Sequence, residues 1–504
     1  MMLKTESAGT AITKSRRGYI CIAAFLIIVL AVWIAIFAIP SPAEVQLSAA
    51  NVQDLSGYDF SNTIYHSNQF WECWPDVYYT PADFAGGLVT EPGRPRGEMD
   101  FFTTQYFTHR VRLILPPGKT YGFMMRSVDY SMRIYINGEL IDSVGNPGET
   151  REETIPRTLR RTYYAQPQSG EVEIILHIAN FVHREGAYPP RLFFSTADNI
   201  AQRNDADMLK SGALFFFLFG ASLYHLGLFL MNRGRKTALL FSAACLLIAF
   251  LDYKLILGFF PGYNWFAAIR FEYINHYLVF AVLTMFFETM YPNLFHKTVT
   301  RVFYVITGIY VILTLILDPK IFTMLLYGFS GACALLAGYI LVRLAKNLKT
   351  RSAQSLLIFV GLLPVALFGF DDIVRVFFPF GIGIHLFLGR SFLTPVGMVF
   401  MVSCYSLAVA LDFADTERRY AVALREISEI KKQLAERKTM RDLSVFGFSE
   451  RESEVAYFLY ADKTRDEIAE LLGISRGTVN TYCNRIFKKA RCRSKEEFAA
   501  LLEE

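Results

Sequence analysis

The residues with the clearest chemical signature lie in one basic stretch near the C-terminus, ISRGTVNTYCNRIFKKARCRSK, at residues 474–495. This stretch has no acidic side chain and seven basic ones: Arg476, Arg485, Lys488, Lys489, Arg491, Arg493 and Lys495. The preceding segment, Glu450 to Glu470, has the opposite balance, with seven acids and three bases. A concentrated positive charge of this kind suits the phosphates of a nucleic acid.

The spacing of these residues predicts a contact surface. On a helix, Arg476, Asn480 and Lys488 lie four or eight positions apart, with Thr481 and Arg485 in the neighbouring row. Such a stripe fits the major groove of DNA, where arginine reads guanine and asparagine reads adenine, while the remaining side chains hold phosphates. The candidate DNA contacts are Arg476, Thr478, Asn480, Thr481, Tyr482, Arg485, Lys488 and Lys489. The alternative is an ordinary solvated basic face.

The elements that must position these side chains are four short helices, at residues 449–460, 464–472, 475–490 and 494–502. Four helix caps occur in succession, three of them with the acidic partner of a capping box: Ser449 with Glu452, Thr464 with Glu467, Ser494 with Glu497, and Ser475 alone. Gly473 permits the tight turn of a helix-turn-helix between the second and third helices. The predicted core consists of Val455, Ile468, Leu471, Leu472, Ile474, Val479 and Ile486.

Residues 448–498 resemble the LuxR/FixJ-type DNA-binding domain over essentially the whole length of that domain. The resemblance rests on Phe448-Ser449, Arg451-Glu452, Glu454-Val455, Glu467-Ile468-Ala469, Leu472, Ile474-Ser475, Thr478-Val479, Ile486 and Lys489. The family's Val-Lys-Thr-His stretch is Val479-Asn480-Thr481-Tyr482 here, and Arg491-Cys492 replaces a common Gly-Val. The resemblance implies DNA binding by the third helix, and these departures bear on which DNA sequence is read.

The rest of the chain has the composition of a membrane protein. The 504 residues are 53% hydrophobic and include 45 phenylalanines, and a helix of about 20 apolar residues crosses a bilayer. Eight runs qualify: Tyr19 to Ile39, Leu209 to Met231, Thr237 to Leu257, Phe271 to Tyr291, Val302 to Leu317, Ile321 to Leu344, Leu356 to Phe378 and Ser391 to Leu411. The last seven predict a bundle at residues 208–411.

Basic residues predict the orientation of these spans. Lys14, Arg16 and Arg17 precede the first run and favour an uncleaved anchor with residues 1–18 inside the cell; the alternative is a cleaved signal peptide. Loops then expected inside carry Arg233, Arg235, Lys236, Lys297, Arg301, Arg343, Lys346, Lys349 and Arg351. Loops expected outside carry only Arg270, Lys320 and Arg390. Residues 40–207 are therefore expected outside and both termini in the cytoplasm.

The external segment has the period-two alternation of β-strands. In SMRIYINGELI, Met132, Ile134 and Ile136 alternate with more polar residues before an Asn137-Gly138 hairpin turn. Similar alternation in THRVRLIL and GEVEIILHIANF predicts a β-sandwich. The hairpin resembles the strand pair of galactose-binding-like jelly rolls, including sensor domains of some bacterial seven-helix receptors. That resemblance implies a ligand-binding module, with carbohydrate as one ligand class.

Two further groups of residues are candidates for function. The candidate ligand contacts are Trp71, Trp74, Tyr78, Tyr79, Asn180, His183 and Arg184, although the aromatic rings equally suit a sandwich core. Ionisable residues at the outer ends of the spans are candidates for coupling the external domain to the bundle, or else are solvated. They are Asp252, Lys254, Arg270, Glu272, His276, Asp371, Asp372 and Arg375. No spacing of residues predicts a catalytic set, a metal site or a cofactor.

Residues 412–442 predict a helical linker. Phe413, Tyr420, Ile427 and Leu434 recur every seven residues, which favours pairing with a second copy, although Lys431 interrupts the stripe. A solitary solvated helix is the alternative.

The layout resembles bacterial seven-transmembrane receptors with intracellular signalling modules. It predicts a multidomain protein of the bacterial inner membrane with an all-β external domain, an α-helical bundle and an all-α DNA-binding domain at residues 443–504. The expected function is a homodimeric, non-enzymatic transcription regulator that senses an external ligand and binds double-stranded DNA. The alternatives are a receptor or transporter whose C-terminal domain docks a protein, and an anchored carbohydrate-active enzyme.

Overall fold

The structure, a computed structural model, describes residues 24, 27–29, 31–36, 38–39, 41–47, 52–125, 129–158, 160–167, 169–257, 260, 262–347, 353–377 and 393–503. It divides into two units with a boundary at Val409. The cytoplasmic segment 1–18 that the sequence predicts lies outside the described residues. Of the first predicted span, the structure describes an apolar helical stretch within Ile27–Ile36.

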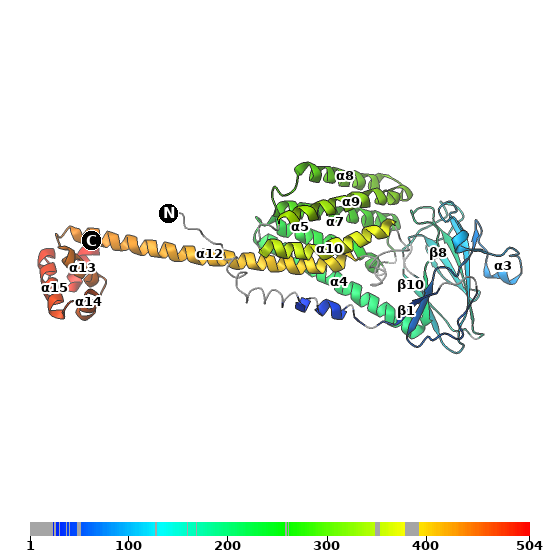
Figure 1. The fold of residues 1–504 in the computed structure, drawn as a ribbon, viewed down its shortest axis with the longest axis horizontal. Helices are drawn as coiled ribbons and strands as arrows, with labels where there is room; N and C mark the ends of the chain where they lie inside the picture. Colours follow the sequence, from blue (N-terminus) through cyan, green and yellow to red (C-terminus); the bar gives the residue numbers. More distant parts are fainter. Residues whose placement is uncertain are drawn as a thin grey trace. The chain divides into compact units, whose positions relative to one another are not determined.

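The N-terminal part of the larger unit consists of two β-sheets (Figure 1). One sheet has the order β1 (Ala43–Gln46), β3 (Thr63–Ser67), β12 (Leu192–Thr196), β7 (Tyr121–Met125) and β10 (Arg161–Ala165). The other has the order β5 (Arg94–Pro95), β4 (Glu72–Pro75), β6 (Tyr106–Ile114), β11 (Glu171–Ala179), β8 (Ser131–Ile136) and β9 (Glu139–Val144), with β2 (Val52–Asp54) also paired to β6. Apolar side chains from both sheets form one core.

Alternating apolar residues position these strands as the sequence predicts. Met132, Ile134 and Ile136 of β8 are buried in the core, as are the alternate apolar residues of β11. Asn137 and Gly138 have φ values of 48° and 86°, the positive values that a type I′ turn requires, and they join β8 to β9. The predicted hairpin is therefore confirmed.

Among the described residues, five helices are long and apolar enough to cross a membrane. They are α4 (Ala197–Met231), α8 (Lys297–Ile316), α9 (Pro319–Asn347), α10 (Ala353–Phe377) and α12 (Thr394–Ser444). Between α4 and α8 lie α5 (Lys236–Ala249), the 3-10 turn η2 (Phe250–Asp252), α6 (Lys254–Leu257) and α7 (Trp265–Met290). By length and composition, the five long helices suggest a multi-pass membrane protein.

Two predicted spans differ from the helices observed. The run from Thr237 to Leu257 is not one helix, because α5 ends at Ala249 and η2 separates it from α6. Just after this break, Tyr253 and Lys254 bond to acidic groups outside their own helix, which an uninterrupted apolar span would not supply. The run from Leu209 is the second half of a longer helix, since α4 begins directly after β12 with Thr196 as its N-cap.

The C-terminal unit contains the four predicted helices. They are α13 (Glu450–Tyr460), α14 (Arg465–Leu472), α15 (Arg476–Ala490) and α16 (Lys495–Glu503). Complete capping boxes start α13 and α14, and Ser475 caps α15. At α16 the box is rearranged, because the Glu497 carboxylate accepts from the Arg493 N–H instead of from Ser494. Gly473 ends α14 with φ 63°, the left-handed conformation expected of the helix-turn-helix turn.

The core of this unit is close to the prediction. Val455, Ile468, Val479 and Ile486 are fully buried. Leu471 is the exception, because it is 56% exposed and belongs to the outer face of α14.

Candidate functional site

The outer face of α15 carries exposed basic side chains. Arg485 and Lys488 are exposed and make no ion pair among the described residues. Arg476, in the first turn, is also exposed, and its Nε lies 3.2 Å from Asp466 of α14. Both partners of this ion pair are about two-thirds exposed, so the pair is weak and easily exchanged for another anion. The three cations are thus available to phosphates or base edges.

Polar groups complete the start of α15. The Ser475 hydroxyl accepts from the Thr478 N–H at 3.1 Å, and the Thr481 hydroxyl donates to the Gly477 carbonyl at 3.0 Å. Asn480 is half-buried, and its Oδ1 is shielded from solvent without a hydrogen-bond partner. The base-reading role of Asn480 therefore stays a prediction, because its acceptor is not open on the basic face in this arrangement.

Two members of the predicted contact set have partners inside the domain. Lys489 Nζ lies 2.5 Å from the buried Glu452 carboxylate and 3.0 Å from the Gly447 carbonyl oxygen. This ammonium, together with the Ser449 N–H, lowers the pKa of Glu452. Tyr482 packs against the apolar core of the domain. Lys489 and Tyr482 therefore support the fold, a role that the sequence does not distinguish from DNA contact.

The geometry of this domain agrees with its family match. Residues 447–502 match the model of the luxR family of bacterial regulatory proteins. The C-terminal domain is a LuxR-type helix-turn-helix. A LuxR-type domain implies DNA binding and is typically non-enzymatic. No curated protein matched the chain.

Outside the LuxR-type domain, the aromatic candidates for ligand binding take core positions. Trp71 is 1% exposed, and Trp74 is buried with its Nε1 donating to the Glu91 carbonyl. The Tyr78 hydroxyl donates to the Gly148 carbonyl at 3.1 Å, and its ring stacks on His177. Tyr79 contacts the Phe84 and Trp74 rings. These contacts favour the core interpretation of the aromatic cluster over an open sugar platform.

The other ligand candidates form one turn that contacts the helices. The Asn180 side chain organises this turn, because its Oδ1 accepts from the N–H groups of Val182 and His183 and its Nδ2 donates to the Glu185 carbonyl. His183 Nε2 lies 3.3 Å from the Tyr273 hydroxyl of α7. The Arg184 N–H donates to Thr323 of α9. Asn180, His183 and Arg184 thus lie at the seam between the β-sheets and the helices.

An ion pair between the buried Asp129 and the partly buried Lys254 lies at the same seam, beside the break between α5 and α6. Lys254 Nζ lies 2.7 Å from Asp129 Oδ2 and 3.5 Å from Glu272 of α7. Burial of Asp129 opposes its ionisation, but the nearby Lys254 ammonium overrides this effect and lowers the pKa of Asp129 to about 2. Tyr253 donates to Glu272 at 2.8 Å. Of the predicted coupling residues, Lys254 therefore contacts the β-sheet domain through Asp129, and Glu272 pairs with the same Lys254.

Hydrogen bonds extend this network into the loop before β10. The Thr158 hydroxyl donates to Asp129 at 2.6 Å and accepts from Trp265 Nε1 at 3.0 Å. Tyr263 bonds both the N–H and the carbonyl of Thr158. No sequence pattern predicts the roles of Asp129, Thr158 or Trp265, because a lone aspartate in a loop has no local pattern that identifies its distant partner.

The remaining coupling candidates are not brought together by the described contacts. Asp372 of α10 accepts from the N–H groups of Leu393 and Thr394 at 2.8–3.1 Å and so caps the start of α12. Asp371 is also buried. His276 lies on α7 near Phe280. The side chains of Asp252 and Arg375 lie outside the described residues.

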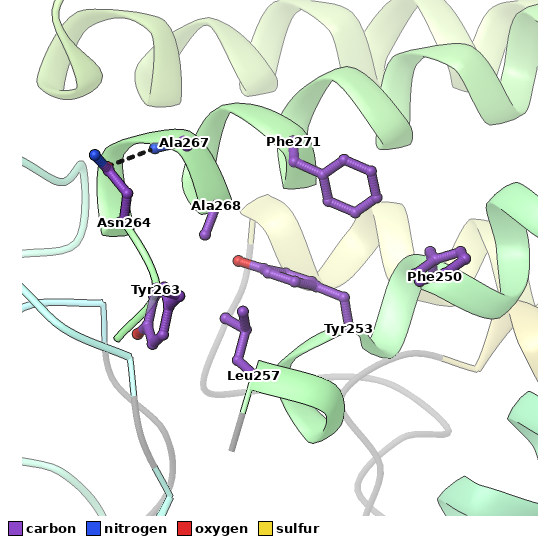
Figure 2. A pocket seen from close by; sticks show the side chains of 8 residues that line it. All are labelled: Phe250, Tyr253, Leu257, Tyr263, Asn264, Ala267, Ala268 and Phe271. Carbon is purple, nitrogen blue, oxygen red and sulfur yellow. Dashed lines mark hydrogen bonds between the residues drawn. The ribbon is translucent and has the colours of Figure 1, made fainter. Parts of the chain in front are cut away.

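An apolar recess lies next to the Lys254 network (Figure 2). It has a volume of about 380 Å³ and is lined by Phe250, Tyr253, Leu257, Tyr263, Asn264, Ala267, Ala268 and Phe271. In Figure 2 the Tyr253 ring lies across the middle of the recess, between Leu257 and Phe271. Because the Tyr253 and Tyr263 hydroxyls belong to the seam network, the recess borders the contact between the two parts.

Proposed function

We propose that the chain is a membrane-bound one-component transcription regulator. Its LuxR-type domain binds promoter DNA, and its β-sheet domain senses a ligand outside the cytoplasm. The observation that carries the DNA-binding proposal is the exposed basic stripe of Arg476, Arg485 and Lys488 on α15 of a LuxR-type fold. The predicted contacts Thr478, Asn480 and Thr481 border this stripe.

The sensing proposal is supported by the contacts at the seam. Asp129, Thr158, His183 and Arg184 of the β-sheet domain bond directly to residues of α6, α7 and α9 or of the turn before α7. A ligand that shifts the β-sheet domain changes these bonds, and α12 continues from the apolar helices towards the LuxR-type domain. Signal and output would then share one polypeptide without phosphotransfer.

A dimer is part of this proposal, because a helix-turn-helix domain commonly reads two half-sites with two copies. The linker stripe on α12 exposes Phe413, Tyr420, Leu424 and Ile427, with Tyr420 69% exposed. Apolar side chains at this spacing are suited to a second parallel helix.

The DNA-binding proposal is tested with the full chain in lipid nanodiscs. Genomic fragments that the protein enriches are measured by fluorescence anisotropy at several salt concentrations. We expect Arg485→Ala and Lys488→Ala each to weaken binding and to reduce the slope of log K against log salt by about one, because each removes one phosphate contact. Arg451→Ala is the matched control, since Arg451 is exposed but pairs with Glu454 on α13.

If neither variant changes DNA affinity at any salt concentration, the proposal is wrong. Capture of a protein instead of DNA would favour the docking alternative. Turnover of a glycoside by the full chain would favour the external enzyme.

A further inference from the structure

Arg184 places a guanidinium at the seam between the β-sheet domain and the helices. Burial opposes its charge, but nearby Tyr273, Glu185 and Glu272 favour the charge and raise the pKa of Arg184. Its Nε and Nη1 are shielded from solvent and have no hydrogen-bond acceptor. The contact made by the guanidinium among the described residues is with the Tyr327 ring, 5.1 Å from the ring centroid. Enclosed guanidinium nitrogens without an acceptor are costly, so such groups normally have an anionic partner.

The backbone around Arg184 is held in place by hydrogen bonds within its turn and to α9. Three bonds from the Asn180 side chain fix the turn, and the Arg184 N–H donates to Thr323 at 3.1 Å. The fixed turn therefore holds two enclosed guanidinium nitrogens without an acceptor. This is the arrangement expected of a binding site whose ligand comes from outside the chain.

A second donor points from α7 into the same region. The Glu185 N–H donates to His183 Nδ1, so His183 carries its proton on Nε2 and donates it to the Tyr273 hydroxyl. Burial lowers the pKa of His183, which keeps this neutral form. Because Tyr273 accepts this bond, its own hydroxyl proton is available to another acceptor.

His276 adds a third polar group. Its Nε2 is shielded from solvent and has no hydrogen-bond partner, and His276 lies three positions after Tyr273 on α7, on the same face of the helix. The nearest acids do not neutralise the guanidinium with an ion pair. Glu272 pairs with Lys254 and Tyr253, and Glu185 is exposed.

We propose that Arg184, Tyr273 and His276 bind an oxyanion, a carboxylate or phosphate group, at the seam. Tyr327 forms the aromatic wall of this site and is 40% exposed, which leaves an open edge for the ligand. The anion would contact the β-sheet domain through Arg184 and the bundle through α7, so its binding would favour one arrangement of the two parts. Its role as a signal rests on the proposed sensor function, but its binding does not.

The test measures anion binding by the full chain in neutral-lipid nanodiscs, without DNA. Thermal unfolding is followed with chloride, benzoate or inorganic phosphate at equal ionic strength, and with uncharged benzamide as the control for the aromatic ring. We expect benzoate or phosphate to raise the unfolding midpoint by several degrees in a saturable manner, as a ligand specific for the folded state does. Benzamide should give no shift. The absence of a shift with both anions, and also in nanodiscs that contain phosphatidylglycerol, overturns the proposal.

Two variants locate the site. Arg184→Gln should abolish the anion-dependent shift, because it removes the guanidinium that would bind the anion. Tyr273→Phe removes a single hydroxyl and should reduce the shift while the chain stays folded. Arg160→Gln is the matched control, since Arg160 pairs with Asp207 on α4 and should leave the anion shift intact. A shift that persists in both Arg184→Gln and Tyr273→Phe overturns the proposal.

Nanodiscs that contain phosphatidylglycerol separate two sources of the anion. A higher midpoint in these discs, lost in Arg184→Gln, identifies an acidic lipid headgroup as the ligand. A shift that requires added benzoate or phosphate identifies a soluble compound. Because DNA binding is not measured, failure of this proposal is distinguishable from failure of the regulator proposal.

Discussion

At the scale of single residues, two adjacent lysines of α15 have different roles. Lys488 is exposed and has no ion-pair partner among the described residues, whereas Lys489 bonds to the buried Glu452. We expect Lys489→Met to destabilise the LuxR-type domain by about 1 kcal/mol, a value reduced because the lysine is 40% exposed. Lys488→Met should leave stability unchanged and weaken DNA binding. Hydrogen exchange of the α13 and α15 amides in the full chain measures the difference.

Asn480 is expected to determine specificity more than affinity. Asn480→Ala should reduce discrimination at one base pair by about 1–3 kcal/mol while the salt dependence of binding stays the same. A selection of bound sequences from a random DNA library, compared between variant and parent, measures this effect. An unchanged preference at every position would remove Asn480 from the base-reading set.

His109 predicts a pH dependence of stability. It is buried between Cys73 and the Ala187 carbonyl, and burial lowers its pKa to about 3. The unfolded chain takes up a proton near pH 6.5, so His109 costs no stability above that pH and about 1.4 kcal/mol per pH unit as the pH falls towards 3. His109→Gln should flatten the decline of the unfolding midpoint between pH 7.5 and 5.5. His296→Gln, at an exposed position, should not.

The sequence predicts surface chemistry and local patterns better than distant partners. The exposed stripe on α15 follows from helical spacing, and the burial of Ile134 follows from strand alternation. Neither pattern distinguishes Lys488 from Lys489, because the distinction depends on Glu452, which is 37 positions away along the chain. From the sequence alone, Trp71 could equally fill a core or stack on a sugar. Only the packing of the two sheets decides between these two positions.

At the scale of elements, the Asp129–Lys254 pair fastens a loop of the β-sheet domain to α6. Removing one partner of a buried ion pair leaves the other uncompensated, at a cost of about 3–5 kcal/mol. We therefore expect Lys254→Met to lower the unfolding midpoint strongly and Asp129→Asn to restore part of it in the double variant. Arg160→Met breaks an exposed pair and should cost less than about 1 kcal/mol. If Lys254→Met and Arg160→Met lower the unfolding midpoint by the same amount, Lys254 has no special role.

The same pair explains why the sequence predicts one span where the structure has α5, η2 and α6. Hydropathy averages over the whole apolar run and treats Asp252 and Lys254 as its end. The helix instead stops at Ala249, and Lys254 bonds to an acid that lies 125 positions earlier. The Asn137-Gly138 hairpin and the capped helices of the LuxR-type domain were predictable because their determinants lie within a few residues of each other.

At the scale of the whole molecule, the proposed dimer depends on the exposed stripe of α12. Replacing Tyr420 and Ile427 by glutamate places charge on this stripe and should convert a dimer to a monomer. The affinity for DNA should fall when the dimer is lost, because two half-sites are no longer bound together. Native mass spectrometry of the full chain measures the oligomeric state. Arg425→Glu on the same helix is the control for added negative charge. A monomeric parent protein would contradict this prediction.

The single helix from Thr394 to Ser444 also has a consequence for how the protein finds its target. A repressor free in the cytoplasm searches the chromosome in three dimensions, whereas a DNA-binding domain joined by this helix to the proposed membrane bundle would stay at the membrane. Under the proposed function, the promoter would therefore have to reach the protein. Transcription of a regulated gene should depend on how often its locus visits the cell periphery, and relocating that gene to a position confined to the nucleoid centre should slow its response without any change in affinity.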